Sequence, residues 1–442
     1  MKIAYGVMGY GRGHAMRTMA VLPSIMAEHE VTVFAGGDAY DVLAPLFPTV
    51  RIPMIGYVYQ ANGSHSVPKT VAKNLAPMAD LFFGGHGCEV VEREIRARGI
   101  ELVISDSEAW THRAAKKLKL PRISFDHVGI IAYCKPHFPP DLWLMGMRDA
   151  IGYRSLMGIP ERILIASFYP AEGAYPGVKV IGPMLRDEVL RTKPTDGDFL
   201  LAYFNKGEHQ YRPNIDHALR QLDCPVVIYG TPYRGKVENL DFRAPSNEWF
   251  VHDLASCRAV MSTAGNQTIG EAIHFGKPIL ALPEEAFEQR LNAWMIERMG
   301  VGMRGSRLAL TPSDVDRFMG NYSFYKSNMS AHAGDGRAEA IATMRRYIDE
   351  LSVAVKAGGK GKPGPRWRGG LGGGQGRHHR EGSRGSGERG AAVEFASGWR
   401  NASDLWRDGS TACDGTESVF DFPRYEFSRL LVIALAEGGI EG

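Results

Sequence analysis

The sequence predicts an α/β protein with two doubly wound domains, each a parallel sheet with helices on both faces. Three observations support this prediction. The chain has 442 residues, 44% of them hydrophobic, which is more than one core holds and enough for two domains with some surplus. Short apolar runs alternate with helical patterns over residues 1–355, as βαβ units require. A polar segment divides these runs into two series.

The apolar runs are predicted to be buried strands, because each stops where Gly, Asp, Ser, Pro or another polar residue appears. The first series comprises residues 3–7, 31–35, 102–105 and 122–125, and the second comprises residues 199–204, 226–229, 259–262 and 279–282. Ligands of doubly wound sheets bind outside the carboxyl ends of the strands. We therefore expect two Rossmann-like domains that face each other across a ligand-binding cleft.

The dividing segment, residues 186–197, is polar and contains Pro194 and Gly197, as an interdomain linker would. The expected domains are therefore residues 1–185 and 198–355. Residues 356–390 contain 14 glycines and almost no apolar residues, so they are expected to form a disordered Gly/Arg-rich C-terminal extension. Residues 391–442 regain aromatic residues without clear periodicity and are left unassigned.

The charge distribution gives no support to nucleic-acid binding by the main body. The formal net charge is +3, and counting Lys and Arg against Asp and Glu gives +7 for residues 356–390, −5 for residues 391–442 and +1 for the rest. No nucleic acid is therefore expected as a partner of the catalytic body. For the Gly/Arg-rich segment, RNA or partner binding stays open beside a solvated tail.

The sequence does not indicate export or membrane insertion. Its first residues reach glycine without the basic and apolar segments of a signal peptide, and no stretch approaches the roughly 20 apolar residues of a membrane-spanning helix. The five cysteines are scattered without a CxxC pair, so neither a disulfide framework nor a zinc site is predicted. These features are typical of a protein of the reducing cytoplasm.

A glycine loop follows the first predicted strand and leads into a helical pattern. It contains Gly9, Gly11 and Gly13, and His14 comes next. The dinucleotide fingerprint GxGxxG requires glycine at the position of His14, so the loop disfavours an NAD-dependent dehydrogenase with Asp38 as its ribose ligand. The glycines themselves indicate only that the backbone passes close to a ligand or to a neighbouring helix.

His14 is a candidate general base, because an imidazole at the carboxyl end of a strand can accept a hydroxyl proton near neutral pH. Asp106, at the end of another strand of the same sheet, would orient the imidazole and stabilise the imidazolium. A structural histidine and a helix N-cap are the alternative interpretations. Asp126 and His127 occupy a similar place after residues 122–125 and are reserve candidates.

The most informative stretch follows the predicted strand 259–262. Small residues let the chain turn into a helix whose first N–H groups face outward, which suits a diphosphate. Glu271, further along this helix, could accept hydrogen bonds from a ribose diol. The candidate diphosphate-binding residues are Thr263, Gly265, Asn266, Gln267 and Thr268.

Glu288 and Gln289 begin the next helical pattern, after residues 279–282 and Pro283. A carboxylate beside an amide suits sugar hydroxyls, which both donate and accept hydrogen bonds. Each residue alone is also compatible with a solvated first-turn position. The spacing of the whole stretch is what makes the pattern specific.

The order of small-residue loop, Glu271, Gly-Lys-Pro, apolar strand, Pro283, Glu288-Gln289 and Asn292-Ala293 resembles the donor-binding region of GT-B glycosyltransferases. It is similar to the UDP-glycosyltransferases and to the N-acetylglucosaminyltransferase that completes lipid II, and most similar to an archaeal and bacterial group with an FEQ..NA segment. The resemblance covers residues 1 to about 350 and implies a GT-B fold, with residues 1–185 binding the acceptor and residues 198–355 the nucleotide sugar. It also implies these roles: diphosphate binding by Gly265, Gln267 and Thr268, ribose binding by Glu271, binding of the transferred sugar by Glu288 and Gln289, and base catalysis by His14 with Asp106.

This chain departs from the pattern at one position. Plant-type members have a histidine eight residues before the ribose-binding glutamate, where this chain has Thr263. A hydroxyl stabilises a phosphate less than an imidazole does, so help to the leaving group is expected mainly from the helix start. The preceding loop, residues 244–250, often holds the nucleotide base in the family, and Trp249 or Phe250 would either stack on that base or pack in the core.

Together these observations predict an inverting glycosyltransferase with a nucleotide-diphosphate sugar, first a UDP-sugar, as donor. No cofactor is expected, and no metal, because no acidic cluster such as DxD stands at a strand end. Hydrolysis or epimerisation of a sugar nucleotide, and non-catalytic sugar-nucleotide, RNA or partner binding, are the alternatives. The acceptor stays open between a small molecule and a lipid-linked glycan. The helical pattern at residues 67–83, which carries Lys69 and Lys73, is compatible with core packing or with peripheral membrane contact.

Overall fold

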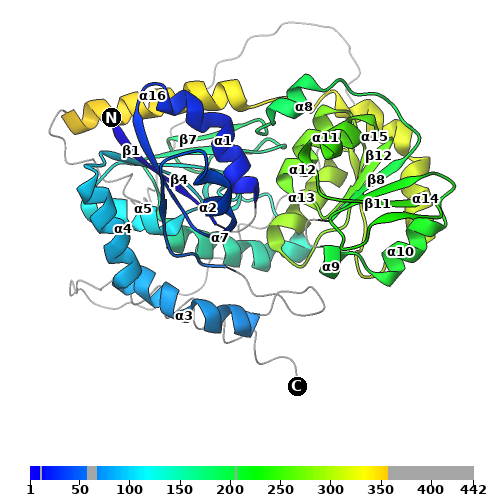
Figure 1. Cartoon of the computed structure of the whole chain (residues 1–442), viewed down its shortest axis with the longest axis horizontal. Coiled ribbons are helices and arrows are strands. Elements are labelled where there is room, and N and C mark those ends of the chain that lie inside the picture. Colours follow the sequence, from blue (N-terminus) through cyan, green and yellow to red (C-terminus); the bar gives the residue numbers. More distant parts are fainter. Residues whose placement is uncertain (10–11, 57–66, 205–206, 357–442) are drawn as a thin grey trace, which may run out of the picture. The chain divides into compact units, whose positions relative to one another are not determined.

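Two seven-stranded sheets form the framework of the protein, with helices interleaved between their strands (Figure 1). The computed structural model describes residues 1–9, 12–56, 67–204 and 207–356. The expected tail segments beyond Lys356 lie outside the described residues, as does Gly11 of the glycine loop.

The first sheet is entirely parallel and has the strand order β3-β2-β1-β4-β5-β6-β7. The order reverses between β1 and β4, and such a switch point is where doubly wound sheets bind ligands. Its strands are β1 (Lys2–Val7), β2 (Glu30–Ala35), β3 (Thr49–Arg51), β4 (Leu102–Asp106), β5 (Arg122–Asp126), β6 (Arg162–Ala166) and β7 (Val178–Ile181). The helices between them are α1 (Arg12–Met26), α2 (Gly37–Leu43), α3 (Val67–Phe83), α4 (His86–Ala97), α5 (Ala109–Leu118), α6 (Ile130–Tyr133), the 3-10 helix η1 (Pro140–Leu142) and α7 (Trp143–Met157).

The second sheet has the order β10-β11-β9-β8-β12-β13-β14 and is parallel except for the edge pair β10 and β11. Its switch point lies between β8 and β12. Its strands are β8 (Leu200–Tyr203), β9 (Val226–Tyr229), β10 (Gly235–Val237), β11 (Leu240–Arg243), β12 (Ala259–Ser262), β13 (Ile279–Ala281) and β14 (Gly302–Arg304). The helices of this part of the chain are α8 (Asp187–Arg191), α9 (Gly207–Gln210), α10 (Pro213–Arg220), α11 (Asn247–Ser256), α12 (Asn266–His274), α13 (Phe287–Arg298), α14 (Pro312–Gly320), α15 (Tyr322–Met329) and α16 (Arg337–Lys356).

The prediction of two doubly wound sheets is confirmed. The eight strands predicted from apolar runs correspond to β1, β2, β4, β5, β8, β9, β12 and β13. Six further strands were missed, and three of them, β3, β10 and β14, have only three residues. β3 and β10 have no buried residue, so they lack the apolar run by which the equally short β13 was recognised.

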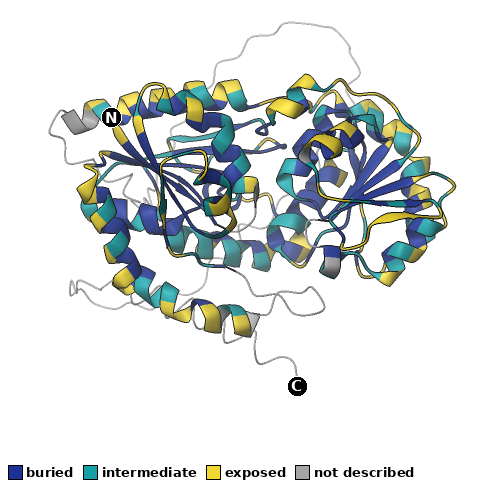
Figure 2. Cartoon of the chain, viewed as in Figure 1, coloured by how far each residue is buried: buried dark blue, intermediate teal, exposed yellow. Residues whose placement is uncertain are grey.

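Alternate side chains of each strand enter different cores, because successive residues of a strand point to opposite faces. Ile3 and Tyr5 of β1 pack in one buried cluster, and Ala4 packs in another. In β8, Leu201 likewise packs in one buried cluster and Leu200 in another. Figure 2 shows the strands of both sheets as buried at their centres. Burial on both faces explains why these strands read as continuous apolar runs.

The last described helix, α16, packs on the first sheet although it follows the second in the sequence. Its buried side chains Ala340, Met344 and Ile348 belong to the core that contains β1 and α1. Figure 1 shows α16 in yellow beside the blue α1. The expected range of residues 198–355 assigned this helix to the second domain, whereas its core contacts lie with the first.

The segment between the sheets is fixed by contacts with the second sheet's helices. The buried Lys277 ammonium donates to the carbonyl of Thr195. At the other end of the segment, a Cβ on Gly270 of α12 would lie 2.7 Å from Pro183. Glycine at position 270 therefore lets the chain after β7 lie directly on α12.

Candidate active site

Three side chains meet at the switch point of the first sheet. Asp106 is the last residue of β4, and His14 and Arg17 lie near the start of α1, which follows β1. Nδ1 of His14 lies 2.7 Å from Oδ1 of Asp106. Arg17 donates from Nε to Oδ2 of Asp106 at 2.8 Å and from Nη2 to Oδ1 at 2.6 Å. The structure thus brings the two predicted residues together and adds an arginine that the sequence analysis did not single out.

The carboxylate of Asp106 determines which nitrogen of His14 carries hydrogen. An ionised carboxylate only accepts hydrogen bonds, so Nδ1 must be the donor. Nη2 of Arg17, 2.9 Å from the same nitrogen, then makes a contact between two donors. Nε2 is left with a lone pair, on a side chain that is 19% exposed. This is the arrangement of a general base that a carboxylate orients.

Asp106 is held in its charged form although its side chain is completely buried. Burial alone would raise the pKa of Asp106, but the charges and hydrogen bonds of Arg17 and His14 lower it below its ordinary value. Burial likewise opposes the charge of Arg17, and the interaction with Asp106 outweighs it and raises the pKa of the guanidinium. A charged, doubly hydrogen-bonded pair therefore stands behind the imidazole.

The reserve candidate Asp126 has structural partners. Its carboxylate accepts hydrogen bonds from the hydroxyls of Ser124 and Tyr153, both at 2.8 Å, and from the backbone N–H of Gly129. Burial, and next the negative charge of Asp106, raise the pKa of Asp126. Asp126 thus fixes the loop after β5. Its neighbour His127 is buried and donates from Nδ1 to the carbonyl of Ala166 at 3.0 Å.

The described part of the glycine loop shows one close backbone approach. A Cβ on Gly9 would overlap the carbonyl oxygen of Gly36, and the N–H of Asp38 donates to the carbonyl of Gly9 at 2.9 Å. Gly9 therefore packs against the loop after β2. A Cβ on Gly13 would meet no atom of the described residues within 4 Å, so none of these residues requires glycine there.

In the second sheet, the chain turns sharply from β12 into α12. Ala264 has a φ of 62°, a left-handed conformation that is uncommon for residues other than glycine. Its carbonyl accepts a hydrogen bond from the buried Asn292 at 3.0 Å, which stabilises the turn. Gly265 is the N-cap of α12, and no side chain of the described residues caps the first N–H groups. The positive end of this helix therefore lacks the usual side-chain acceptor.

The candidate diphosphate-binding residues surround this helix start. Thr263 and Thr268 are buried, and Asn266 is partly exposed. A Cβ on Gly265 would meet no atom of the described residues within 4 Å. Gln267 differs from the others, because its Nε2 donates to the carbonyl of Met184 at 2.9 Å and to Oε1 of Glu271 at 2.7 Å. Its amide N–H groups already have partners within the protein.

Glu271, the predicted ribose ligand, is 1% exposed and binds an arginine of the segment between the sheets. Arg186 donates from Nε to Oε1 and from Nη2 to Oε2, both at 2.7 Å. Both carboxylate oxygens are therefore occupied. A ribose diol would have to replace the guanidinium at this carboxylate.

The two predicted sugar-binding residues lie in the first turn of α13 and have different partners. Glu288 extends toward the first sheet, where its Oε1 lies 3.6 Å from Nε2 of His127. Gln289 accepts a hydrogen bond from the backbone N–H of Glu284 at 2.9 Å and donates to the Glu284 carboxylate at 3.3 Å. Glu284 is buried and was not predicted from the sequence.

Several buried polar atoms near the carboxyl ends of the second sheet have no hydrogen-bond partner among the described residues. They follow β9, β12, β13 and β14, and they are Oγ1 of Thr231, Oδ1 of Asn266, Oε1 of Glu284 and Nε of Arg307. Buried polar groups are nearly always hydrogen-bonded, so such a group needs a specific explanation. Their position at the ligand-binding edge of the sheet suggests that a polar ligand supplies the missing partners.

The two aromatic residues predicted to stack on the nucleotide base or to pack in the core take different positions. Phe250 packs against Tyr203 and Tyr229, with ring centroids 4.9 and 5.5 Å apart, and is a core residue. Trp249 is 62% exposed and lies beside His252. Of the two, only Trp249 has a ring face available to a ligand.

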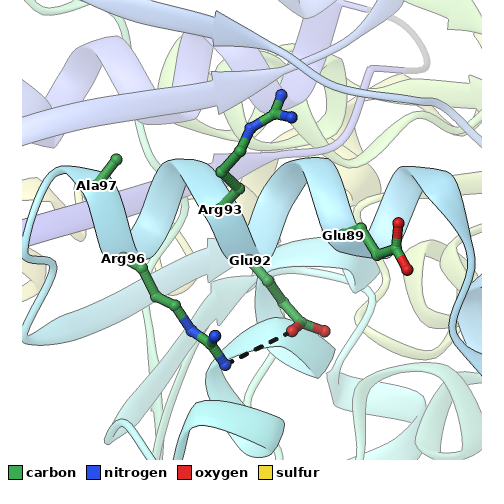
Figure 3. Close-up of a pocket in the computed structure, with 5 residues that line it drawn as sticks. All are labelled: Glu89, Glu92, Arg93, Arg96 and Ala97. Carbon is green, nitrogen blue, oxygen red and sulfur yellow. Dashed lines mark ion pairs between the residues drawn. The ribbon is translucent and has the colours of Figure 1, made fainter.

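The pocket drawn in Figure 3 lies away from these residues, on α4. Within it Arg96 points toward Glu92, and their ion pair measures 3.9 Å. Glu92 also pairs with Lys117 at 2.7 Å. The lining residues of the pocket all belong to α4, and they are Glu89, Glu92, Arg93, Arg96 and Ala97. This surface of ion pairs carries none of the predicted site residues.

The described residues contain neither a candidate membrane-spanning helix nor a candidate metal centre. None of the helices there is long and apolar enough to cross a membrane. No group of three or more His, Cys, Asp or Glu side chains in the described ranges is arranged to hold a metal ion.

The sequence matches a family of known proteins. The family model described as glycosyl transferase family 1 matches residues 1–322. An uncharacterised glycosyltransferase of Methanosarcina acetivorans is 25% identical over 343 residues, which cover 68% of this chain and 85% of the relative. An uncharacterised glycosyltransferase of Methanosarcina mazei is 24% identical over 350 residues, covering 71% and 88%.

Solved glycosyltransferase structures share the fold. MurG of Acinetobacter baumannii superimposes with a TM-score of 0.52 and 15% identity, covering 78% of this chain and 99% of MurG. The calicheamicin glycosyltransferase CalG4 gives 0.56 and 16%, covering 79% and 98%. A UDP-glucosyltransferase from Polygonum tinctorium gives 0.57 and 13%, also covering 79% and 98%. At these identities the likeness shows the fold alone.

Proposed function

Because the chain belongs to glycosyl transferase family 1 and is a glycosyltransferase, we propose that it transfers a sugar from a nucleoside-diphosphate donor to an acceptor hydroxyl with inversion. The observation that carries the proposal is the 2.7 Å contact between His14 and Asp106 at the switch point of the first sheet. A UDP-sugar is the first donor to test, because one of the similar structures is a UDP-glucosyltransferase and another was solved with dTDP.

In the proposed reaction, Nε2 of His14 takes the proton of the acceptor hydroxyl as its oxygen attacks the anomeric carbon. The bond between that carbon and the diphosphate oxygen breaks, and the nucleoside diphosphate leaves with the electron pair. Asp106 stabilises the imidazolium that forms. The uncapped start of α12 stabilises the departing negative charge, which is important because Thr263 cannot supply a positive charge.

The unsatisfied polar atoms near the carboxyl ends of the second sheet support donor binding there. Hydroxyl and phosphate groups of a nucleotide sugar could pair with the carboxylate of Glu284 and the guanidinium of Arg307. Arg307 is 4% exposed, and its Nη1 donates to the carbonyl of His209 at 3.1 Å. We accordingly assign donor binding to residues 198–335 and acceptor binding to residues 1–185, with α16 as part of the first core.

Donor binding at Glu271 requires a rearrangement in this proposal. Arg186 holds both carboxylate oxygens, so the ribose hydroxyls and the guanidinium compete for Glu271. Arg186 lies on the segment between the sheets and is partly exposed, with 13% of its side chain accessible. A displaced Arg186 would remain close to the nucleotide and keep its positive charge there.

The decisive experiment measures binding first and products second. We expect UDP-, dTDP- or GDP-sugars to raise the melting temperature of the full chain, since a ligand of the folded state stabilises it. With the best binder, a glycosylated acceptor would support transfer, whereas free sugar or an epimerised donor would point to hydrolysis or epimerisation. If no sugar nucleotide changes the melting temperature or the heat of binding, the proposal is wrong.

A further inference from the structure

A group of polar atoms that includes the predicted sugar ligand Glu288 lies between the first sheet and α13. His127 follows β5, Tyr169 follows β6, and Glu288 lies in the first turn of α13. His127 and Tyr169 are 2% and 5% exposed. Their rings meet edge to face with centroids 6.4 Å apart. Oε1 of Glu288 lies 3.6 Å from Nε2 of His127.

Two of these atoms lack hydrogen-bond partners among the described residues, and both are buried. They are Nε2 of His127 and the hydroxyl oxygen of Tyr169. The Ala166 carbonyl fixes the tautomer of His127, because a carbonyl accepts only and Nδ1 must therefore carry the hydrogen. In the neutral imidazole Nε2 is then an acceptor. It faces a carboxylate, which also accepts.

The electrostatic setting favours the neutral imidazole. Burial lowers the pKa of His127 below its ordinary value, although the charge of Glu288 acts in the opposite direction. Burial, and next the charge of Glu288, raise the pKa of Tyr169, so this residue keeps its O–H donor. The group therefore combines one donor, the phenol, with two acceptors that have no hydrogen between them.

A hydroxyl matches this combination, because it can accept from Tyr169 and donate to His127 or Glu288. A vicinal pair of hydroxyls would satisfy all three residues. Nε2 of His127 is covered in this structure, while the Glu288 side chain is 35% exposed and so has room to rotate aside.

The position of the group also fits a sugar next to the base. β4, β5 and β6 are neighbours in the first sheet, and neighbouring strands lie about 4.8 Å apart. His127 is therefore one strand from Asp106, and Tyr169 is two strands away. A pyranose that contacts all three residues would lie beside the dyad of His14 and Asp106.

We propose that His127, Tyr169 and Glu288 form a subsite for hydroxyl groups of the transferred sugar, and that His127 and Tyr169 determine which sugar is accepted. This inference rests on the proposed glycosyl transfer and extends it to first-sheet residues that select the donor sugar. Removal of either first-sheet group should weaken binding of the nucleotide sugar and leave binding of its nucleoside diphosphate unchanged.

The test uses the full chain with Tyr169→Phe and His127→Asn. Tyr169→Phe removes only the hydroxyl, and the asparagine amide of His127→Asn can still donate to Ala166 but lacks an atom at Nε2. The probes are UDP-glucose, UDP-N-acetylglucosamine, dTDP-glucose and GDP-mannose, with UDP, dTDP and GDP as their sugar-free counterparts, measured by calorimetry. We expect affinity for the best nucleotide sugar to fall about 3- to 10-fold in each variant, the effect of one neutral hydrogen bond.

Tyr133→Phe is the matched control. Its hydroxyl is also buried in the first half of the chain, but it donates to the carbonyl of Gly158 at 2.6 Å. Its loss should lower the melting temperature without changing the ratio of the two affinities. Tyr169→Phe should keep the wild-type melting temperature, because the removed hydroxyl forms no hydrogen bond with any described residue.

The possible outcomes separate the inference from the function on which it rests. If wild type binds neither nucleotide sugars nor nucleoside diphosphates, the proposed function fails and the subsite with it. If wild type binds both but the variants keep the wild-type affinity, or lose affinity for sugar and sugar-free nucleotides alike, the subsite is wrong and the proposed function stands. A lower kcat at unchanged donor affinity in His127→Asn would also contradict the subsite, since it would indicate a role for His127 in proton transfer.

Discussion

Arg17 donates hydrogen bonds to both carboxylate oxygens of Asp106, and the same carboxylate accepts a hydrogen bond from His14. All of these contacts are buried or nearly so. The candidate base is therefore supported by an ion pair inside the protein and not by solvent.

Arg17→Met should strongly destabilise the protein, because it leaves the charge of Asp106 buried without its main partner. The expected loss in the free energy of unfolding is about 3–5 kcal/mol, measured by urea denaturation at pH 7. Lys135→Met, which breaks the exposed pair with Glu172, should cost less than about 1 kcal/mol. Similar small losses in both variants would show that the buried pair contributes little.

His14→Ala and Asp106→Asn should each lower kcat by at least about 100-fold and leave the dissociation constant of the nucleotide-sugar donor within twofold of wild type. The proton acceptor is lost in the first variant, and the second no longer enforces the tautomer with hydrogen on Nδ1. Steady-state kinetics and calorimetry provide the two measurements. His252→Ala removes an exposed imidazole as a control. Wild-type kcat in His14→Ala would exclude this residue as the base.

Glu271→Gln should weaken binding of UDP by about tenfold and of 2′-deoxy-UDP by much less, because only the ribonucleotide offers the diol that the carboxylate would bind. Calorimetry with the two nucleotides measures the difference. Arg186→Lys serves as a companion, since it keeps the charge but not the two-point contact with Glu271. Equal losses for both nucleotides would assign Glu271 to a structural pair with Arg186.

His112 should make the protein less stable in acid. Its imidazole is buried without hydrogen-bond partners among the described residues, and burial lowers its pKa well below the ordinary value. The folded state therefore keeps His112 neutral while the unfolded state gains a proton below about pH 6.5. The contribution of His112 to the free energy of unfolding is fully present above that pH. It falls by about 1.4 kcal/mol for each pH unit below it, until the pKa of the folded state is reached.

The measurement compares the free energy of unfolding at pH 7.5 and 5.5 in wild type and His112→Leu. The leucine variant should lack this share of the pH dependence, whereas other titrating groups affect both proteins alike. His217→Leu, which removes an imidazole at a solvent-accessible position of α10, is the control. Identical pH dependence in wild type and His112→Leu would contradict the prediction.

The sequence was sufficient to predict the fold and to suggest Asp106 as the partner of His14, because both inferences depend on general geometry. Short continuous apolar runs form strands buried on both faces, and residues after neighbouring parallel strands reach the same edge of the sheet. Arg17 could have been found as well, since it lies three residues after His14 on one helix and thus on the same face.

The remaining site residues depend on contacts that no local pattern encodes. Arg186 lies in a segment that was identified only as a linker, and its contact with Glu271 joins residues 85 positions apart. Tyr169 follows a strand, β6, that was not predicted. Gln289 of α13 pairs with Glu284 of the preceding loop, a contact that depends on the backbone between β13 and α13.

The packing of α16 on the first sheet determines the order in which the two cores can form during synthesis. The first sheet is complete at Ile181, but its core waits for Met344 and Ile348, which are synthesised after the whole second sheet. At about 5–20 residues per second, a ribosome needs roughly 10 to 35 s for that stretch. During this interval the face of β1 and α1 that α16 covers has no permanent partner. The nascent chain therefore completes its second sheet before its first core can close.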